Sequence, residues 1–326
     1  MAKHIFSNKT FREAFTFVNK NSTTWFPGHM HKGMMQLQAK LKDIDCIIEV
    51  HDARIPFAGR NPNFQTHLMV RPHILVLNKM DLADLSRRKE VEQRLKDEGV
   101  KTVLYTDCRD NKDKVIKSQL IPTALNLIKN SERYHRTEET TYNMLVIGIP
   151  NVGKSSLINK LRNLNRKINP GKASQVGAVP GITRSVMEKI IVCDQPKIYV
   201  RDSPGILDPS VKDVHVGMKL AVCATLKDHL VGEEIVADYM LYWLNKLDNF
   251  QYVDYFGLKN PTDDILQFLM EVAKKYNFSR KHRSVEGGGV QMRPDLGRAA
   301  HFALKAFREG KLGKVMMDVD YIYTNR

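Results

Sequence analysis

Features that would place this chain of 326 residues in several common protein classes are missing from its sequence. No apolar run approaches the roughly 18 residues of a membrane-spanning helix, and neither terminus offers a lipidation motif. The sequence therefore gives no support for a membrane-spanning protein or a lipid-anchored signalling protein. The four cysteines are scattered and form no C-x-x-C pair, so neither a zinc ribbon nor a disulfide framework is indicated. They are Cys46, Cys108, Cys193 and Cys223.

Acidic residues are also in deficit. The chain holds 51 Lys and Arg against 36 Asp and Glu, which gives a formal net charge of +15. Such an excess favours a polyanionic partner, and RNA fits better than a membrane. Charge alone is only suggestive, since many mitochondrial proteins are basic without touching RNA. The hydrophobic content of 42% suffices for a packed core, and the length suggests one domain plus a smaller partner.

A glycine-containing segment near the middle of the chain carries a strong chemical signal. The run Gly148-Ile149-Pro150-Asn151-Val152-Gly153-Lys154-Ser155 reads G-x-x-x-x-G-K-S, the pattern of a phosphate-binding loop. Its glycines let backbone N–H groups point at the β-phosphate, where a Cβ would block close approach. Lys154 would supply charge to the β- and γ-phosphates, and Ser155 would offer its hydroxyl to Mg²⁺. The apolar residues 143–147 predict a buried strand, and the residues from Ser156 onward predict a helix whose N-terminus faces the phosphates.

A second motif lies earlier in the chain. Asn78-Lys79-Met80-Asp81 reads N-K-x-D, the guanine-recognition signature of GTPases, and follows an apolar strand predicted at 73–77. The carboxylate of Asp81 would accept hydrogen bonds from the ring N–H and the exocyclic amine of guanine. Adenine lacks both donors at these places, so Asp81 would favour GTP over ATP. Asn78 and Lys79 are expected to brace the loop. The alternative interpretation is a strand-to-helix loop with polar caps.

Two further segments complete the set expected of a GTPase. Asp202-Ser203-Pro204-Gly205 follows the apolar residues 198–200 and matches D-x-x-G. Asp202 would hold Mg²⁺ through water, and the Gly205 N–H would donate to the γ-phosphate. Thr183, in the segment 180–184, would ligate Mg²⁺ when the γ-phosphate is present; the alternative is an ordinary turn residue.

The order of these motifs predicts the fold. The phosphate loop usually comes first and the guanine motif last, whereas here the order is reversed, which indicates a circularly permuted GTPase domain. Strand-like runs alternate with helix-like stretches, the pattern of a doubly wound, mainly parallel sheet with ligand loops at the carboxyl ends of the strands. The charged segment 130–141 would join the ends of the unpermuted domain. The strand-like runs lie near 46–50, 73–77, 102–106, 143–147 and 198–200.

The two ends of the chain differ from its middle. Residues 1–24 form a basic extension with apolar residues at helical spacing, among them Phe11, Phe15 and Val18, which predicts a mitochondrial presequence; a basic helix retained for RNA contact is the alternative. We expect the GTPase domain over 25–208 and a small all-helical domain over 209–326, with helices near 217–230, 233–247, 262–276 and 296–309. In that domain, the basic run 280–283 is expected to be a flexible loop that contacts phosphate or is simply solvated.

The sequence with these motifs resembles a known family, the circularly permuted GTPases that assemble large ribosomal subunits. Within that family it resembles the mitochondrial branch. The resemblance rests on the motif order, on Asp52-Ala53-Arg54-Ile55-Pro56 and on Trp25-Phe26-Pro27-Gly28-His29-Met30, and it runs from about Trp25 to the C-terminus. It implies GTP hydrolysis coupled to late maturation of the large mitochondrial ribosomal subunit, with contact to its rRNA. It also implies a matrix protein peripherally associated with the inner membrane. We expect a monomer.

The resemblance also bears on catalysis. A Gln that orients the attacking water often follows D-x-x-G, but Ile206 stands there, and it cannot hydrogen-bond to water. The family assigns the role to the His of its W-F-P-G-H-M segment, here His29, whose pKa near neutrality suits it; the alternative is a histidine that caps the helix beginning at Met30. If no group replaces the Gln, the chain would be a nucleotide-gated RNA-binding scaffold with negligible hydrolysis.

The phosphate loop also suggests a binding site for a potassium ion. In related G-x-x-N-x-G-K-S loops the Asn, here Asn151, helps to coordinate K⁺ beside the phosphates; an ordinary turn bond is the alternative. Ser155, Thr183 and Asp202 are the expected Mg²⁺ ligands. The residues expected to contact GTP are Asn78, Lys79, Asp81, Gly148, Asn151, Val152, Gly153, Lys154, Ser155, Ser156, Thr183, Asp202 and Gly205. A weaker assignment adds a backbone contact to guanine from Thr106-Asp107-Cys108.

Overall fold

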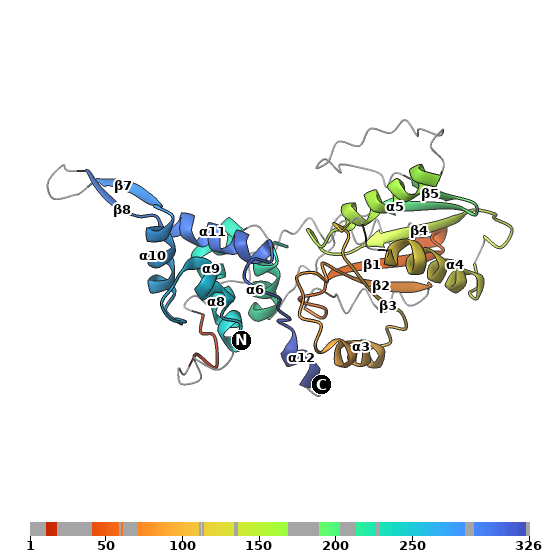
Figure 1. The fold of residues 1–326 in the computed structure, drawn as a ribbon. Coiled ribbons are helices and arrows are strands. Elements are labelled where there is room, and N and C mark those ends of the chain that lie inside the picture. Colours follow the sequence, from red (N-terminus) through yellow and green to blue (C-terminus); the bar gives the residue numbers. More distant parts are fainter. Residues whose placement is uncertain are drawn as a thin grey trace. The chain divides into compact units, whose positions relative to one another are not determined.

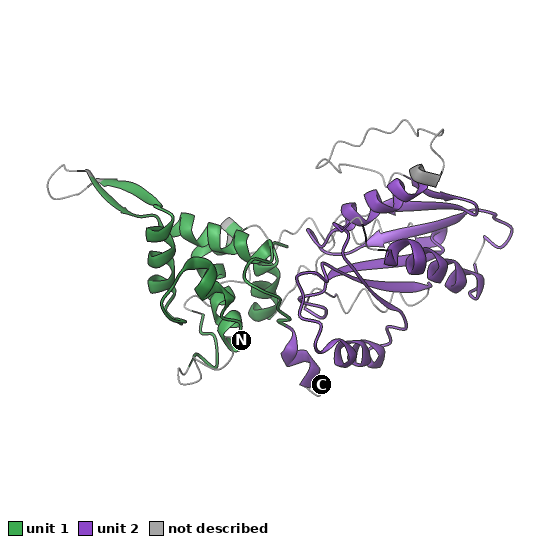
Figure 2. Ribbon diagram, viewed as in Figure 1, with its two compact units in different colours: residues 1–25, 211–317 green, residues 26–210, 318–326 purple. Residues whose placement is uncertain are grey.

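The structure is a computed structural model in which the chain forms two compact units (Figure 2). One unit, called here the sheet unit, comprises residues 26–210 and 318–326. The other, the helical unit, comprises residues 1–25 and 211–317. The structure describes residues 11–17, 41–58, 60, 71–110, 112, 114–133, 136–168, 189–202, 213–225, 228–283 and 290–323.

The sheet unit is built on six strands in the order β3-β2-β1-β4-β6-β5 (Figure 1). All neighbouring pairs are parallel except β5 and β6, which are antiparallel. Every residue of the central strand β1 is buried, as expected for a parallel strand covered on both faces. The predicted mainly parallel sheet is therefore present. The strands are β1 (Cys46–Asp52), β2 (His73–Asn78), β3 (Val103–Thr106), β4 (Tyr142–Ile147), β5 (Lys189–Asp194) and β6 (Lys197–Asp202).

Helices connect these strands. The longest among the described elements of this unit, α5 (Lys154–Ile168), begins at the lysine of the phosphate loop and follows β4 directly. The last described residues of the chain return to this unit, where α12 lies against α3. The other helical elements of the unit are η2 (Leu41–Asp43), α3 (Arg88–Asp97), the π-helical turn η3 (Ile116–Leu120), α4 (Ile121–Lys129) and α12 (Val319–Tyr323).

The segment expected to join the ends of the unpermuted domain is fastened to the sheet by a buried carboxylate. Asp45 accepts hydrogen bonds from Arg133 at 3.1 Å, from Arg136 at 3.2 Å and from the backbone N–H of Asn143 at 2.7 Å. Two arginines paired with one buried carboxylate offset the cost of removing its charge from water. The connection between α4 and β4 is thus held at the amino-terminal edge of the parallel strands.

The helical unit surrounds one buried helix, α8, in which nine of fourteen residues are buried. Asp213, Asp264 and Asp295 cap α6, α10 and α11 by accepting backbone N–H bonds. Three helices lie close to predicted stretches: α8 (Glu233–Lys246), α10 (Ile265–Lys275) and α11 (Leu296–Arg308). The stretch predicted as one helix near 217–230 instead holds two, α6 (Val214–Val222) and α7 (Asp228–Val231), and α9 (Gln251–Phe256) was not predicted. Among the described residues, no helix combines the length and the hydrophobicity that a membrane-spanning segment requires.

The basic run 280–283 is not the loop that the sequence predicts. It lies in β7 (Ser279–Arg283), which pairs antiparallel with β8 (Val290–Pro294) in a hairpin that extends away from the helices (Figure 1). The strand was not predicted because all five side chains of β7 are polar, so β7 shows no alternation of apolar and polar residues, and the alternation in β8 covers only five residues. The unit therefore contains a hairpin in addition to the predicted helices.

The described part of the N-terminal segment, residues 11–17, belongs to the helical unit and forms no helix. Arg12 pairs with Asp238 at 2.7 Å and with Asp263 at 3.0 Å, and the ring of Phe15 is buried against Tyr239. The sequence predicts that residues 1–24 form an extension separate from the helical domain. The ion pairs of Arg12 and the buried ring of Phe15 instead join residues 11–17 to the helices of that unit. The apolar spacing that predicts a helix face instead serves an irregular segment anchored by a few side chains.

Candidate nucleotide-binding site

The two motifs that are far apart in the sequence line one pocket. The guanine motif follows β2 and the phosphate loop follows β4, and both strands end at the same edge of the sheet as β1, which separates them. Ligand sites of open α/β sheets form at this carboxyl edge. The pocket, of about 240 Å³, is lined by Asn78, Lys79, Asp81, Leu82, Asp107, Cys108, Arg109, Asn151, Gly153, Lys154, Ser155 and Ser156.

Both glycines of the phosphate loop are required by their surroundings. Gly148 has φ of 147°, and a Cβ there would overlap the carbonyl oxygen of Val50 on β1. Gly153 has φ of 102°, and a Cβ there would overlap the side-chain amide of Asn78. The loop can therefore pass this close to the neighbouring strand and to the guanine motif only without side chains at these positions.

Asn78 joins the two motifs directly. Its side-chain Nδ2 donates to the carbonyl oxygen of Val152 in the phosphate loop at 2.8 Å. Its Oδ1 accepts from the Cys108 N–H at 3.0 Å and from the Thr106 hydroxyl at 3.3 Å. Since Asn78 is 3% exposed, these bonds are shielded from water and fix three loops around the pocket. Sequence reasoning missed the bond to Val152, because no local pattern reports a contact over 74 residues.

Lys79 is held in an unusual backbone conformation by a buried ion pair. Its φ is 60°, a left-handed value that costs a non-glycine residue about 1 kcal/mol or more. Its Nζ lies 3.0 Å from Asp52 Oδ2, and the same carboxylate accepts from the Arg54 guanidinium at 2.7 and 2.9 Å. Burial would raise the pKa of Asp52, but the charges of Arg54 and Lys79 outweigh it and hold that pKa well below its ordinary value.

Asp81 lines the pocket while staying in contact with solvent, and a second carboxylate lies nearby. Burial, followed by the negative charge of Asp107, raises the pKa of Asp81. Both effects disfavour the ionised carboxylate, and they outweigh a hydrogen bond from the backbone N–H of Asp81 and the charges of Arg109 and Arg54. A ligand that brings two N–H donors would reverse this disadvantage. The surroundings of Asp81 thus favour a base with donors on its edge over one without them.

Lys154 is buried within its own loop. Its Nζ donates to the carbonyl oxygens of Ile149 at 3.0 Å and Gly148 at 3.1 Å. Burial lowers the pKa of Lys154 to about 8, and the charge of Asp202 partly opposes this effect. A phosphate placed beside Lys154 would supply the missing negative charge and favour the ammonium form. The loop is therefore electrostatically prepared for an anion.

The remaining predicted site residues fall into two groups. His29, Thr183, Gly205 and Ile206 lie outside the described residues. Asp202 ends β6, and Asn151 lines the pocket with φ of 59°. The expected Thr106-Asp107-Cys108 segment does line the pocket in part, while Leu82 and Arg109 are lining residues that the motifs do not predict.

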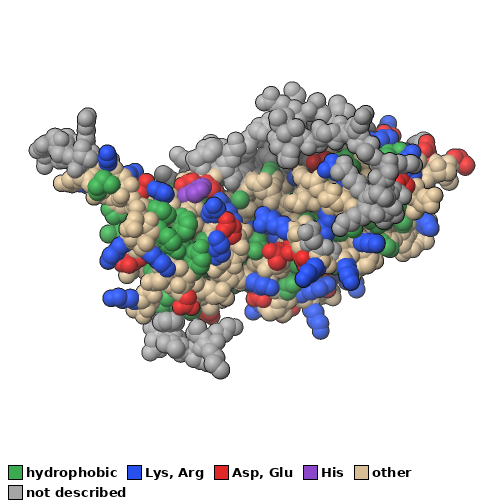
Figure 3. Space-filling model, turned by 45° about the horizontal axis from the view of Figure 1, so that its top comes forward, with side chains coloured by type: hydrophobic (Ala, Val, Ile, Leu, Met, Phe, Trp, Pro, Cys, Tyr) green, Lys and Arg blue, Asp and Glu red, His purple; other side chains and the backbone are tan. Residues whose placement is uncertain are grey.

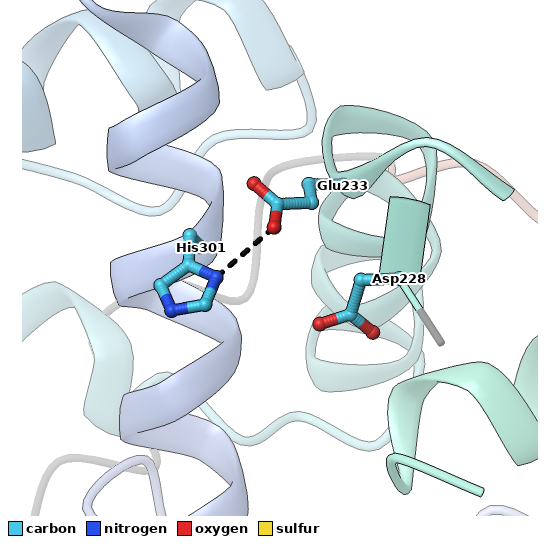
Figure 4. A group of neighbouring side chains, drawn as sticks. All are labelled: Asp228, Glu233 and His301. Atoms are coloured by element: carbon cyan, nitrogen blue, oxygen red, sulfur yellow. Dashed lines mark hydrogen bonds and ion pairs between the residues drawn. The ribbon is translucent and has the colours of Figure 1, made fainter. Parts of the chain in front are cut away.

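A second group of side chains with metal-ligand chemistry lies in the helical unit (Figure 4). His301 on α11 faces Glu233 at 3.0 Å, and Asp228 on α7 lies beside them. Both oxygens of Asp228, however, accept hydrogen bonds from Arg308, at 2.6 and 2.7 Å. A cation there would compete with a guanidinium for the same carboxylate, so the group is best described as an ion-pair network that ties three helices together.

Comparisons with known proteins agree with this geometry. The family model described as "50S ribosome-binding GTPase" matches residues 143–274. "Mitochondrial ribosome-associated GTPase 1" of Ictalurus punctatus is 48% identical over 96% of this chain and 97% of its own length. The protein of that name from Mus musculus is 49% identical over 95% and 94%.

The chain belongs to the mitochondrial ribosome-associated GTPase 1 family. Its fold is similar to that of GNP-bound YlqF from T. maritima, with a TM-score of 0.57, 21% identity, and coverage of 88% of this chain and 97% of the other. The predicted circularly permuted P-loop GTPase fold is confirmed. As a member of the mitochondrial ribosome-associated GTPase 1 family, the chain binds guanine nucleotide and hydrolyses GTP.

Proposed function

We propose that this GTPase is a switch that binds the large mitochondrial ribosomal subunit and promotes its late assembly, and thereby supports mitochondrial translation. The observation that carries the proposal is that Asp81 of the guanine motif and Lys154 of the phosphate loop line the same pocket. Relatives that share nearly its whole length are named as mitochondrial and ribosome-associated, and the net charge of +15 suits an RNA partner.

In this proposal, GTP lies across the pocket with its base at the guanine motif. Asp81 accepts from the guanine ring N–H and amine, and the Lys79 stem lies along the base. The N–H groups of the loop from Gly148 to Gly153 and of Ser155 and Ser156 cradle the phosphates at the N-terminus of α5, beside Lys154. The same carboxyl edge holds both ends of the ligand.

The metal ions follow from the donor chemistry. Ser155 and Asp202 offer hydroxyl and carboxylate oxygens, the ligands that Mg²⁺ prefers, and Thr183 would complete the set. Mg²⁺ supplies charge neutralisation at the β- and γ-phosphates when bound. Asn151 would offer a carbonyl oxygen to K⁺; hydrolysis equally fast in NaCl and KCl would refute that assignment.

Catalysis is assigned to His29, since Ile206 cannot orient water. His29 would position the attacking water when the ribosomal subunit is bound. Gly205 would transmit the presence of the γ-phosphate to α6, because in the sequence it lies between the end of β6 at Asp202 and the start of α6 at Val214. We expect GTP to alter the RNA affinity of the helical unit by this route.

The RNA contact is assigned to basic side chains of the helical unit. Arg280, Lys281 and Arg293 are exposed on the hairpin, and Figure 3 shows Lys and Arg side chains distributed over the visible face of the molecule. We place the protein in the matrix as a monomer, with peripheral contact to the inner membrane. A scaffold with negligible hydrolysis is disfavoured because the relatives are named as GTPases.

The deciding experiment measures GTP turnover with and without purified large mitochondrial subunits, for the wild type and for His29→Ala. We expect the subunit to stimulate the wild type and not the variant. Stimulation of both would remove the role of His29. Stimulation of neither, with no subunit-bound protein recovered in a sedimentation assay, would overturn the proposed function.

A further inference from the structure

A carboxylate from the far end of the chain is buried against the loop that follows β1. Asp318 is 0% exposed, and its Oδ2 accepts from the backbone N–H groups of Phe57 at 2.8 Å and Ala58 at 2.9 Å. Burying a charge is costly unless it is well hydrogen-bonded, and two consecutive N–H groups converging on one oxygen provide that compensation. The C-terminal segment is thus fixed at one point of the sheet unit by a specific polar contact.

Neighbouring contacts strengthen the attachment. Tyr321 stacks on Phe57 with ring centroids 5.8 Å apart and an interplanar angle of 18°. Tyr323 lies under the guanidinium of Arg87 at 5.3 Å and donates to Glu90 at 3.3 Å, which joins α12 to α3. Aromatic stacking adds to the polar contact without replacing it. Residues 318–323 therefore clamp the loop 53–58 from one side.

The other end of that loop supports the guanine motif. The N–H of Ala53 donates to the carbonyl oxygen of Asn78 at 2.8 Å, and Asp52 holds Lys79 through the ion pair described above. Within the loop, the N–H of Ile55 donates to Asp52 at 3.0 Å, and Arg54 bonds to the Asp52 carboxylate. A short, internally bonded loop therefore connects the contact with Asp318 to the left-handed backbone of Lys79.

We propose that Asp318 is a positioning residue for guanine recognition. By pinning Phe57 and Ala58, it holds the loop 53–58 against Asn78 and Lys79 and so keeps the guanine motif in its strained, binding-competent form. Asp318 directly follows Met317, the last residue of the helical unit. The peptide bond between them therefore links the helical unit to the residue that holds the loop 53–58. This inference rests on the proposed assignment of Asn78, Lys79 and Asp81 to the guanine base.

The test compares GDP dissociation constants, measured by titration with a fluorescent GDP, across a matched set of variants. Asp318→Ala is expected to raise the constant about tenfold, while the turnover number at saturating GTP stays unchanged. Asp318→Asn keeps an oxygen able to accept both N–H bonds and should stay within twofold of the wild type. Asp45→Ala is the control: it also removes a buried carboxylate that accepts a backbone N–H, but at the opposite edge of the sheet.

Three results would overturn the inference. The first is an unchanged GDP dissociation constant for Asp318→Ala. The second is an equal rise of that constant in Asp45→Ala, when both alanine variants have lost the same unfolding free energy. The third is a dissociation constant for Asp318→Asn as high as that of Asp318→Ala. Should Asp318→Ala not fold, Tyr321→Ala removes only the ring on Phe57 and is expected to raise the constant about threefold; no rise contradicts the inference. Asp81→Ala separates this inference from the proposed site, since its failure to weaken GDP binding would overturn the site itself.

Discussion

The side chain of Asn78 donates a hydrogen bond of 2.8 Å to the backbone carbonyl of Val152. This bond links the guanine motif to the phosphate loop across 74 positions of the chain. Permutation has exchanged the order of the two motifs along the chain, but both still lie at the carboxyl edge of one sheet. Contacts of this kind, rather than sequence order, determine whether the two motifs can act on one ligand.

Asn78→Ala removes bonds to two loops at once. We expect the GDP affinity to fall by about 2 kcal/mol, roughly thirtyfold, since both the phosphate loop and the Thr106–Cys108 segment lose a buried partner. Calorimetric titration with GDP measures the change. Asn126→Ala, on the exposed face of α4, is the control and should bind as the wild type does. An unchanged affinity for Asn78→Ala would show that the loops hold their places independently.

Asp81→Asn exchanges a carboxylate for an amide that presents one donor and one acceptor. We expect GTP binding to weaken by 10-fold or more, on the order of 1–3 kcal/mol, and binding of xanthosine triphosphate to improve, because xanthine replaces the amine of guanine by a carbonyl. Asp84→Asn, a nearby exposed carboxylate that accepts from the Ser86 N–H, should leave the preference unchanged. Equal loss of both nucleotides in Asp81→Asn would contradict the assignment.

The pKa of Lys154 predicts how binding depends on pH. Burial lowers this pKa to about 8 from 10.5, so the nucleotide-free protein loses the ammonium charge as the pH rises through 8, whereas the unfolded chain keeps it to 10.5. The unfolded chain binds the extra proton between these two pH values, so this group makes the unfolding free energy of the nucleotide-free protein increase as the pH rises from about 8 to 10.5. A bound phosphate favours the charged form, so GDP affinity should be flat below pH 8 and fall above it.

Titrations between pH 7 and 9.5 in buffers of different ionisation enthalpy measure both the affinity and the proton uptake. Lys154→Arg keeps its charge over this range and should lose the pH dependence. Proton release on binding by the wild type above pH 8 would have the wrong sign and would contradict the assignment.

Residues 11–17 are expected to stabilise the helical unit. Phe15→Ala should lower its free energy of unfolding by about 3 kcal/mol, because the ring is 7% exposed and packs on Tyr239 and Tyr242. Urea denaturation of the full chain, followed by tryptophan fluorescence from the buried Trp243, reports on this unit. Thr16→Ala, at an exposed position of the same segment, is the control, and equal stability of the two variants would contradict the packing.

The sequence predicts the features whose chemistry is local. Gly148 and Gly153 predict a phosphate-binding loop in which a side chain at either position would block close approach. The apolar runs along the chain predict the strands of a parallel sheet. The contacts that hold Lys79 in place could not be predicted from the sequence. Asp52 pairs with both Arg54 and Lys79, and Asp318 binds the loop 53–58, only once the chain has folded. The hairpin of β7 and β8 was not predicted, because β7 holds only polar residues and the period-two pattern of β8 is only five residues long. Residues 11–17 show the opposite discrepancy. Their apolar residues have the spacing of a helix, but the segment packs against the helical unit without forming one.

Two segments in reversed order along the chain form one guanine-nucleotide site. Calorimetric titration of the purified wild-type chain with GDP, and separately with ADP, tests it most directly. We predict one GDP bound per chain and no saturable binding of ADP at the same concentrations. Equal affinity for the two nucleotides, or two GDP molecules bound per chain, would contradict the account.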